Sequence, residues 1–243
     1  MKLKKLIPIA LILLLLGLVC GIAGIAMNGF TFQGLDNTYT RHETSISDPV
    51  TTIRVDEKNG AVRILPWDGS EISLTYYTSE HENYTITTAD GTLSIEKTTE
   101  RKWYMFSFSL SAPELIIRVP EGFSGDVEVV SSNGKLEADS IRAGTLSLTT
   151  SNGEVDLEDV RADLITVRTS NGSIEFDDIE AGEISLKTSN GAIEGSLPHP
   201  RSHYSITSQT SNGSNNAPSI QPGGVCLLTL ITTNGSIDVE FDD

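Results

Sequence analysis

The chain is poor in cysteine and in aromatic residues. It contains two cysteines, and only 6% of its 243 residues are aromatic. Cys20 lies inside a long apolar run and Cys226 lies in a segment of alternating apolar residues, so we expect no internal disulfide. Basic residues are also scarce, with 17 Lys and Arg against 33 Asp and Glu. A formal net charge of -16 argues against nucleic-acid binding.

Motifs for catalysis and metal binding are missing as well. The sequence has no phosphate-binding loop, nucleophile elbow or paired-cysteine metal motif. The one close pair of histidines, His199 and His203, is interrupted by Pro200 in a loop, so we expect no metal role for it. The sequence therefore nominates no catalytic residue and no cofactor.

One long hydrophobic run does occur, at the N-terminus. Residues 6–27 carry no charge and follow the basic residues Lys2, Lys4 and Lys5. About twenty apolar residues can cross a hydrocarbon core, and flanking basic residues place the N-terminus in the cytoplasm. A cleaved signal peptide is the first alternative, and lipidation of Cys20 is the second.

The run predicts a single-pass protein of the cell membrane with four parts. These are a cytoplasmic tip at 1–5, a transmembrane helix at 6–27, a linker at 28–45 and an extracytoplasmic repeat domain at 46–243.

A short motif recurs through the second half of the chain. Two Ser or Thr residues precede each Asn-Gly, and the asparagines are spaced by 19, 19, 19, 22 and 22 residues. Apolar residues alternate on both sides of each Asn-Gly, which indicates two half-buried strands per unit. The same register extends upstream to Asn59-Gly60 and Asp90-Gly91. The six regular asparagines are Asn133, Asn152, Asn171, Asn190, Asn212 and Asn234.

Two architectures suit these units. In a hairpin array each Asn-Gly is a two-residue type I′ turn. In a single-stack β-solenoid each unit of about 19 to 22 residues is one coil, and equivalent residues stack at the strand spacing. We favour the solenoid because a hairpin does not need the repeated Ser/Thr pair.

Stacking predicts that the asparagine amides form a ladder in chain order, which would put Asn234 at its end. The glycines are then expected to adopt the left-handed conformation of a corner. The fifth unit is irregular, since Asn215 stands at an apolar position and Pro218 and Pro222 follow. We interpret this stretch as a protruding loop, and residues 198–203 as a second excursion.

The strand "LIIRVPEG" and the [Ser/Thr]-Asn-Gly-x-[Ile/Val] units, together with the anchor, resemble a bacterial repeat domain called "putative adhesin". The resemblance covers about residues 46–243 and includes LiaG-like proteins that accompany cell-envelope stress systems. It implies an extracytoplasmic β-solenoid without an established activity, and it supplies no catalytic residues.

Acidic residues recur on the expected outer face. Four residues after the repeat asparagine stand Glu137, Asp156, Glu175, Glu194 and Asp238, and six residues after it stand Asp139, Glu158, Asp177 and Glu240. Stacked coils would place them in columns, where like charges repel. The columns could hold divalent cations, or they could be a solvated acidic face, which we favour. We expect four basic residues to neutralise them in part: Arg142, Arg161, Arg168 and Lys187.

The sequence thus predicts a membrane-anchored, non-catalytic adhesion, scaffold or cell-envelope-stress module that binds an envelope component or a membrane protein. A carbohydrate-active enzyme is the alternative, although its two carboxyl groups need unlike environments and stacked acids share one environment. Net repulsion and the anchor argue against a polymer-forming solenoid.

The aromatic segment "KWYMFSFSL", residues 102–110, is predicted to form a strand that lies in the core or at a cap, or that presents a partner-binding patch.

Overall fold

The structure is a computed structural model that describes residues 14, 15, 17, 39–99 and 113–242. The chain divides into two compact units, Met1–Asn37 with Trp103–Ser109 and Thr38–Lys102 with Leu110–Asp243. Of the first unit, only residues 14, 15 and 17 are described.

Two sequence expectations fall outside the described residues. These are the transmembrane helix at 6–27, apart from residues 14, 15 and 17, and the aromatic strand at 102–110. Within the described ranges, the structure contains no helix long and apolar enough to cross a membrane.

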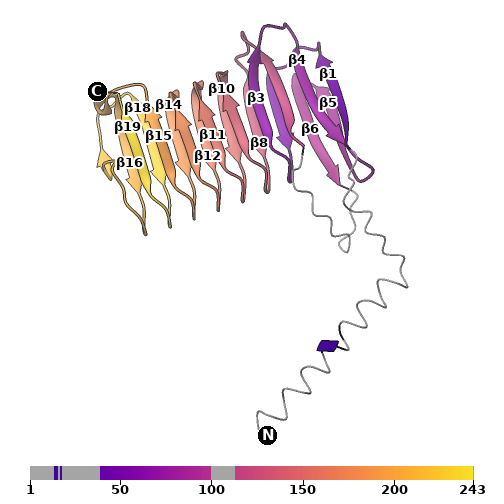
Figure 1. Ribbon diagram of the computed structural model, residues 1–243. Coiled ribbons are helices and arrows are strands. Elements are labelled where there is room, and N and C mark those ends of the chain that lie inside the picture. Colours follow the sequence, from indigo (N-terminus) through magenta and orange to yellow (C-terminus); the bar gives the residue numbers. More distant parts are fainter. Residues whose placement is uncertain (1–13, 16, 18–38, 100–112, 243) are drawn as a thin grey trace. The chain divides into compact units, whose positions relative to one another are not determined.

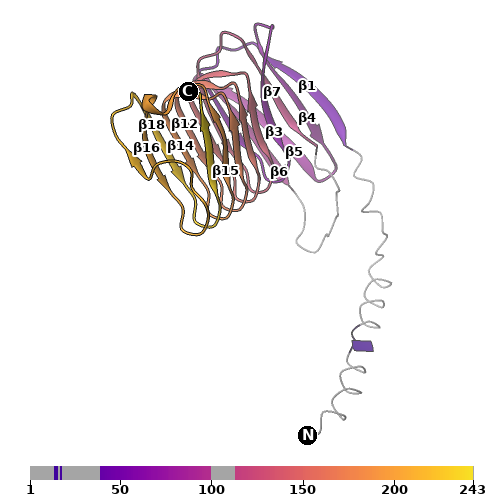
Figure 2. The same cartoon turned by 60° about the vertical axis from the view of Figure 1, so that its left-hand side comes forward.

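The second unit is built from two β-sheets, which Figures 1 and 2 show from two sides. Sheet A has, in spatial order, the strands β1 (Thr40–Ile46), β4 (Ile72–Thr78), β7 (Leu115–Pro120), β3 (Val62–Trp67), β9 (Leu136–Asp139), β11 (Val155–Glu158), β13 (Ile174–Asp177), β15 (Ile193–Leu197) and β19 (Ile237–Phe241). Sheet B has β17 (Ile220–Gln221), β16 (Tyr204–Gln209), β18 (Cys226–Ile231), β14 (Glu180–Lys187), β12 (Arg161–Arg168), β10 (Arg142–Thr149), β8 (Asp126–Val130), β2 (Thr52–Asp56), β6 (Thr92–Thr99) and β5 (Glu82–Ala89). A 3-10 turn, η2, spans Arg201–His203.

Each regular repeat forms one coil of a stack. The chain runs along a strand of sheet B, turns at Asn-Gly, returns along a strand of sheet A and turns again into the next coil. β10, β12 and β14 pair in parallel, so that Leu146 lies opposite Ile165 and Ile165 opposite Ile184. This is the stacked arrangement and not the hairpin array. It also confirms the prediction of an all-β fold.

The core lies between the two sheets and consists of the inward residues of every coil. Leu146, Val155, Ile165 and Ile174 are all 0% exposed. Full burial of an aliphatic side chain of this size stabilises a fold by about 1.5–3 kcal/mol. The period-two pattern of the sequence therefore places one apolar layer on the inner face of each sheet.

The repeat glycines are required for a different reason from the one expected. Positive φ angles among described glycines occur at Gly91, Gly195 and Gly223, not at the repeat corners. A Cβ atom on Gly153 would instead lie 1.8 Å from the carbonyl oxygen of Gly134 in the preceding coil. The left-handed corner was therefore the wrong prediction, because close stacking of backbones is what excludes a side chain here.

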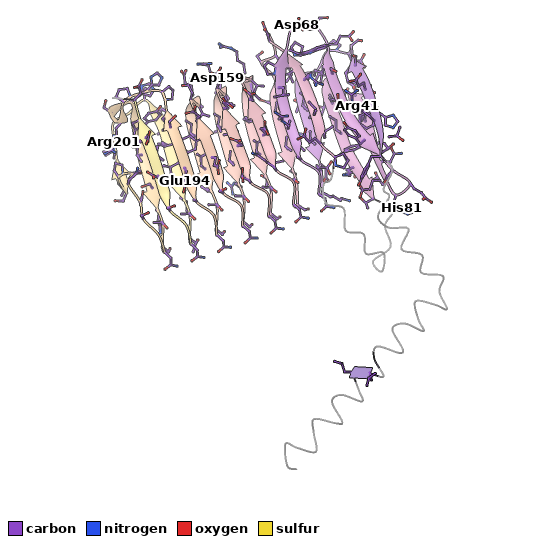
Figure 3. The ribbon with its side chains drawn as sticks, in the orientation of Figure 1. Arg41, Asp68, His81, Asp159, Glu194 and Arg201 are labelled. Carbon is purple, nitrogen blue, oxygen red and sulfur yellow. The ribbon has the colours of Figure 1, made fainter. Side chains whose placement is uncertain are left out.

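Left-handed residues stand at the second corner of the coil, which the sequence analysis did not identify. Ser140, Asp159 and Asp178 have φ values of 54, 47 and 53°. Small polar residues tolerate this conformation better than bulky ones do. A Ser or Asp seven residues after the repeat Asn was the available signal. Figure 3 shows Asp159 at the edge of the stack where these second corners lie.

The upstream Asp90-Gly91 is not a repeat corner. It has φ angles of 50 and 75° and joins β5 to β6, which pair antiparallel with Ala89 opposite Thr92. This is the geometry of a two-residue hairpin turn. Including Asp90-Gly91 in the repeat register was therefore wrong.

The spatial order of the coils differs from their order in the chain at both ends. β18 pairs with β14 on one side and with β16 on the other, so the last coil lies inside the stack. The irregular fifth unit forms the end, where β17 covers the edge of β16 and Asn215 bridges to Ile237. At the opposite end, β2 lies between β6 and β8. There β1 begins at Thr40, within the segment that had been assigned to the linker.

Seven asparagine side chains form a ladder along the Asn-Gly corners. In each of the six bonds between them, one Nδ2 donates to the Oδ1 of the neighbouring asparagine at 2.7 or 2.8 Å. The spatial order is Asn59, Asn133, Asn152, Asn171, Asn190, Asn234 and Asn212. The end of the ladder is therefore Asn212, and the expectation that Asn234 stands there was wrong because the last coil is inserted before the fifth unit.

We expect Asn171→Ala to lower the free energy of unfolding by about 1–3 kcal/mol, since it removes the two ladder hydrogen bonds that Asn171 makes with Asn152 and Asn190. Asn234→Ala should cost a similar amount, and Asn212→Ala less, because Asn212 has one ladder neighbour. Denaturant unfolding of the three variants measures the difference. A loss at Asn234 as small as that at Asn212 would contradict the inserted position of the last coil.

Candidate functional site

The outer face of sheet A carries the acidic residues found in the sequence, and the strands place them in register. Parallel pairing sets Glu137 beside Asp156, Asp156 beside Glu175, Glu175 beside Glu194 and Glu194 beside Asp238. We call these five residues the first acidic column. Glu194 is labelled on this face in Figure 3. Strand alternation causes the placement, because the intervening residues enter the core.

A second acidic column runs beside the first. Asp139 pairs with Glu158 and Glu158 with Asp177. In the next coil the position is occupied by Ser196, whose hydroxyl donates to Asp177 and whose strand partner is Glu240. The second column is thus interrupted by one neutral hydroxyl.

Positive charge reaches the first acidic column near one end. Arg63 lies 2.8 Å from Glu137, and Lys135 lies 3.1 Å from Asp156 and 3.2 Å from Glu154. These contacts hold the pKa of Lys135 above its usual value despite partial desolvation. The neighbouring carboxylates are one strand spacing apart, roughly 4.8 Å.

The basic residues expected to neutralise the columns lie elsewhere. Arg142, Arg161, Arg168 and Lys187 belong to β10, β12 and β14 of sheet B, not to sheet A. Each coil is divided between two sheets, so the prediction that these four residues neutralise the columns was wrong.

Glu175, in the middle of the first acidic column, is affected by the neighbouring carboxylates. Its pKa is raised, first by partial desolvation and then by the carboxylates of Glu154 and Asp156. In the described part of the chain, no group of three or more His, Cys, Asp and Glu side chains could hold a metal ion. The face can present regularly spaced negative charge to a cationic partner.

A buried ionic cluster near the same end of the stack as Arg63 was missed in the sequence. Glu57 stands two residues before Asn59, where the regular units have Ser or Thr. It is 1% exposed and Lys97 is 2% exposed, and Lys97 Nζ lies 2.9 Å from Glu57 and 3.4 Å from Glu82. Glu57 also accepts hydrogen bonds from the Tyr84 hydroxyl and the Gly60 amide. The missing Ser/Thr was the available signal.

The cluster fixes the charge state of Glu57. Burial opposes ionisation, but Lys97, the Tyr84 hydroxyl and the Gly60 amide together hold its pKa below the usual value. Glu57 therefore does for Gly60 what Ser and Thr hydroxyls do in other coils, and it also neutralises a lysine from β6. The cluster therefore connects the corner at Gly60 to Tyr84 and Lys97 on β5 and β6.

The two histidines that the sequence analysis set aside line a shallow pocket. Its volume is about 240 Å³, and its walls are Arg161, Ala162, Glu180, Ala181, Gly182, His199, His203 and Tyr204. The two imidazole rings are 4.2 Å apart, and His199 Nε2 lies 4.0 Å from Glu180. The buried Tyr204 hydroxyl has no hydrogen-bond partner in the described ranges, although the backbone of His199 is close.

The pocket contributes one carboxylate, Glu180, among its lining residues. Glu180 also lies 3.7 Å from Arg161. General acid and base catalysis on a glycoside needs two carboxyl groups whose pKa values differ. The residues that line this pocket do not include such a pair of carboxyl groups.

The sheets and the columns together define an all-β repeat protein built as a solenoid-like stack. The family model of Toastrack DUF4097 matches residues 50–198, more than half of the chain. The chain therefore belongs to this family, and the resemblance stated from the sequence is confirmed. A search of curated proteins finds no match.

Solved structures of bacterial proteins are similar at low sequence identity. A "putative cell adhesion protein" from Clostridium sporogenes ATCC 15579 is 14% identical, with 84% of this chain and 100% of that chain covered and a TM-score of 0.53. A "putative adhesin" from Bacteroides fragilis NCTC 9343 is 11% identical, with coverages of 85% and 98% and a TM-score of 0.44. Another from Parabacteroides distasonis ATCC 8503 is 16% identical, with coverages of 84% and 98% and a TM-score of 0.31. The likeness to the Clostridium sporogenes structure shows that this chain and that protein share a fold.

We expect Glu175→Gln to stabilise the protein at neutral pH. The raised pKa of Glu175 means that ionisation is harder in the folded state, so its charge costs stability above the folded pKa. The gain should stay below about 1 kcal/mol because solvent screens an exposed side chain. It should vanish as the pH falls below the usual carboxyl pKa, where Glu175 is protonated in both states.

Melting curves over a range of pH measure this effect. Sodium chloride should stabilise the wild type as well as calcium chloride does at matched ionic strength. A rise in melting temperature that only calcium produces, and that Glu175→Gln abolishes, would instead assign the first acidic column to cation binding.

We expect Lys97→Met to lower the free energy of unfolding by about 3–5 kcal/mol at neutral pH, because it leaves buried acids without their cation. The loss should shrink as the pH falls, since protonated carboxyl groups need no counter-charge. The wild type should instead lose stability as the pH falls. The pKa of Glu57 is lowered in the folded state, and the stability from its ionised form is lost when the pH falls through that pKa. The exposed Lys58→Met is the matched control and should change little. Equal losses at Lys97 and Lys58 would contradict a buried pair.

Proposed function

We propose that the chain is a non-catalytic adhesion or scaffold module, anchored in the cell membrane and presenting its stack on the extracytoplasmic side. The observation that carries the proposal is the outer face of sheet A, where two acidic columns stand in fixed register. Such a face is suited to a partner that carries repeated positive charges. We infer a partner of this chemistry among the components of the cell envelope, or a basic surface of a membrane protein.

The rigidity of the stack supports binding to an extended partner. Every regular corner is tied by an asparagine amide, and the Thr hydroxyls two residues before the asparagines donate to the neighbouring coil, as Thr169 does to Gly153 at 3.0 Å. The charges on sheet A are therefore held at a constant spacing. A preorganised array loses little conformational entropy when a polymer binds.

Several observations favour binding over catalysis. The carboxylates of the columns repeat in similar environments, whereas an acid and a base need environments that separate their pKa values. The carbohydrate-active enzyme therefore stays the second reading. The name of the Clostridium sporogenes structure is in line with an adhesion role, since that protein is called a "putative cell adhesion protein".

The location of the module is inferred from the sequence. Residues 6–27 are apolar and follow three lysines, the arrangement of a single-pass anchor with its N-terminus in the cytoplasm. A reporter fused after Asp243 should then be active only outside the cytoplasm. Release of a soluble form that starts near Met27 would show a secreted protein instead.

We expect the triple variant Glu158→Gln, Glu175→Gln and Glu194→Gln to bind isolated cell-envelope fractions at least about tenfold more weakly than the wild type, since rim charges mainly set association. The matched control is Glu96→Gln, Glu128→Gln and Glu183→Gln, which removes the same charge from sheet B. Sedimentation of the full-length protein with each fraction, at two salt concentrations, measures the binding. Equal binding by both variants would exclude the face of sheet A, and saturable cleavage of an envelope polysaccharide would support the enzyme.

A further inference from the structure

The Asn-Gly corners share one chemical hazard. In an Asn-Gly sequence the backbone nitrogen of glycine can attack the side-chain carboxamide of the asparagine, because glycine offers no side chain to block the approach. The attack requires a free glycine nitrogen and a carboxamide that can turn toward it. The stack holds these two groups differently from one corner to the next.

At the corners of Asn133, Asn152, Asn171 and Asn190 both groups are held by hydrogen bonds. The N–H groups of Gly134, Gly153, Gly172 and Gly191 donate to the Ser or Thr hydroxyl two residues before the asparagine, at 3.1–3.3 Å. The asparagine amides are fixed in the ladder on both sides. Gly134, Gly153 and Gly172 are also buried. Reaction at these corners requires local opening of a coil.

The corner at Asn212 and Gly213 lacks this protection. Asn212 and Gly213 are both exposed, in contrast to the interior glycines. Asn212 Nδ2 donates to Asn234 at 2.8 Å, but no described residue donates to its Oδ1. Within the described ranges the Gly213 N–H also has no hydrogen-bond partner, and Thr210 bonds only to the carbonyl of Gly235.

The position of this corner explains why the Asn212 carboxamide is bonded on one side only. Asn212 ends the ladder, because the fifth unit is the outermost coil. After Gly213 the chain enters the irregular segment up to Pro218 instead of a strand of sheet A. In the described stack no further coil follows whose asparagine could donate to the Oδ1 of Asn212.

We propose that Asn212-Gly213 is a site of spontaneous covalent self-modification. The Gly213 nitrogen forms a bond to Cγ of Asn212, the bond from Cγ to Nδ2 breaks, and ammonia leaves with the proton that the Gly213 nitrogen gives up. Water then opens the cyclic imide at either carbonyl. The products are aspartate, or isoaspartate with an extra methylene in the backbone, and each adds one negative charge.

Asn234-Gly235 provides an internal comparison. The Gly235 N–H has no hydrogen-bond partner in the described part of the chain, yet the Asn234 amide is bonded on both sides in the ladder. Asn234 should therefore react more slowly than Asn212 and faster than Asn171. The predicted order follows the hydrogen bonds, since the dipeptide is the same at all three corners.

The modification would act on the end of the stack. Asn212 N–H donates to Thr233 at 2.9 Å and its side chain donates to Asn234. Conversion removes the side-chain donor, and a charged carboxylate then faces the Asn234 carbonyl. The fifth unit should loosen while the interior coils stay in place. This inference is independent of the proposed binding function.

The test is site-resolved peptide mapping of the full-length protein by mass spectrometry after incubation at mildly alkaline pH. Asn212 should convert about tenfold or more faster than Asn133, Asn152, Asn171 and Asn190, because each of those must first break several hydrogen bonds. In strong denaturant the difference should disappear, which shows that structure and not the neighbouring sequence sets the rate.

Two variants complete the test. Asn212→Gln lengthens the side chain and should stop conversion at this corner without changing the others. Thr169→Val removes the hydroxyl that accepts from Gly172 and should make the interior Asn171 reactive. If Thr169→Val fails to fold, the wild-type rates still decide the matter. Equal rates at Asn212 and Asn171 in the folded wild type, or a stable Asn212 where the denatured chain converts, would overturn the proposal.

Discussion

The close approach of successive backbones at the Asn-Gly corners is the constraint on which the stack depends. A Cβ atom on Gly172 would lie 1.8 Å from the carbonyl oxygen of Gly153, a distance that no side chain can meet. With glycine in place the coils stack at the strand spacing, and this spacing brings the asparagine amides within 2.7 Å of each other. The same spacing holds the acidic residues of sheet A in register. The packing at one corner therefore sets both the ladder and the charged face.

The two ends of the stack use other means because they have no neighbour to continue the pattern. Antiparallel strands lie there, with β1 beside β4, β5 beside β6 and β17 beside β16. Such edge pairing limits the exposure of unpaired backbone groups that could recruit other chains. Glu57 replaces a hydroxyl where Lys97 enters, so a salt bridge takes over the role of a side-chain hydrogen bond.

The features that the sequence predicted are those that a single repeat contains. Strand alternation, the core residues such as Leu146 and Val155, and the acidic columns all follow from positions relative to one asparagine. The order of the coils could not be predicted, because it depends on pairing between residues far apart, such as Leu186 with Leu230. Asp90-Gly91 was assigned to the repeat for a related reason, since a hairpin turn and a stacked corner can have similar sequences although their backbone conformations and strand pairing differ.

The fold can carry a crowded acidic surface because the residues that stabilise each coil are not those on the outer face of sheet A. The stability of each coil comes from its buried inner residues and its corner hydrogen bonds, and neither involves the outer side chains of sheet A. Repulsion at Glu175 is then a small cost against a core of fully buried aliphatic residues. Outer positions can change without loss of the stack, as the replacement of an acid by Ser196 in the second acidic column illustrates. Under our proposal, this tolerance of substitution suits the outer face of sheet A to binding. Its charged residues can vary to match a partner, whereas the corner residues are fixed by the packing of the backbones.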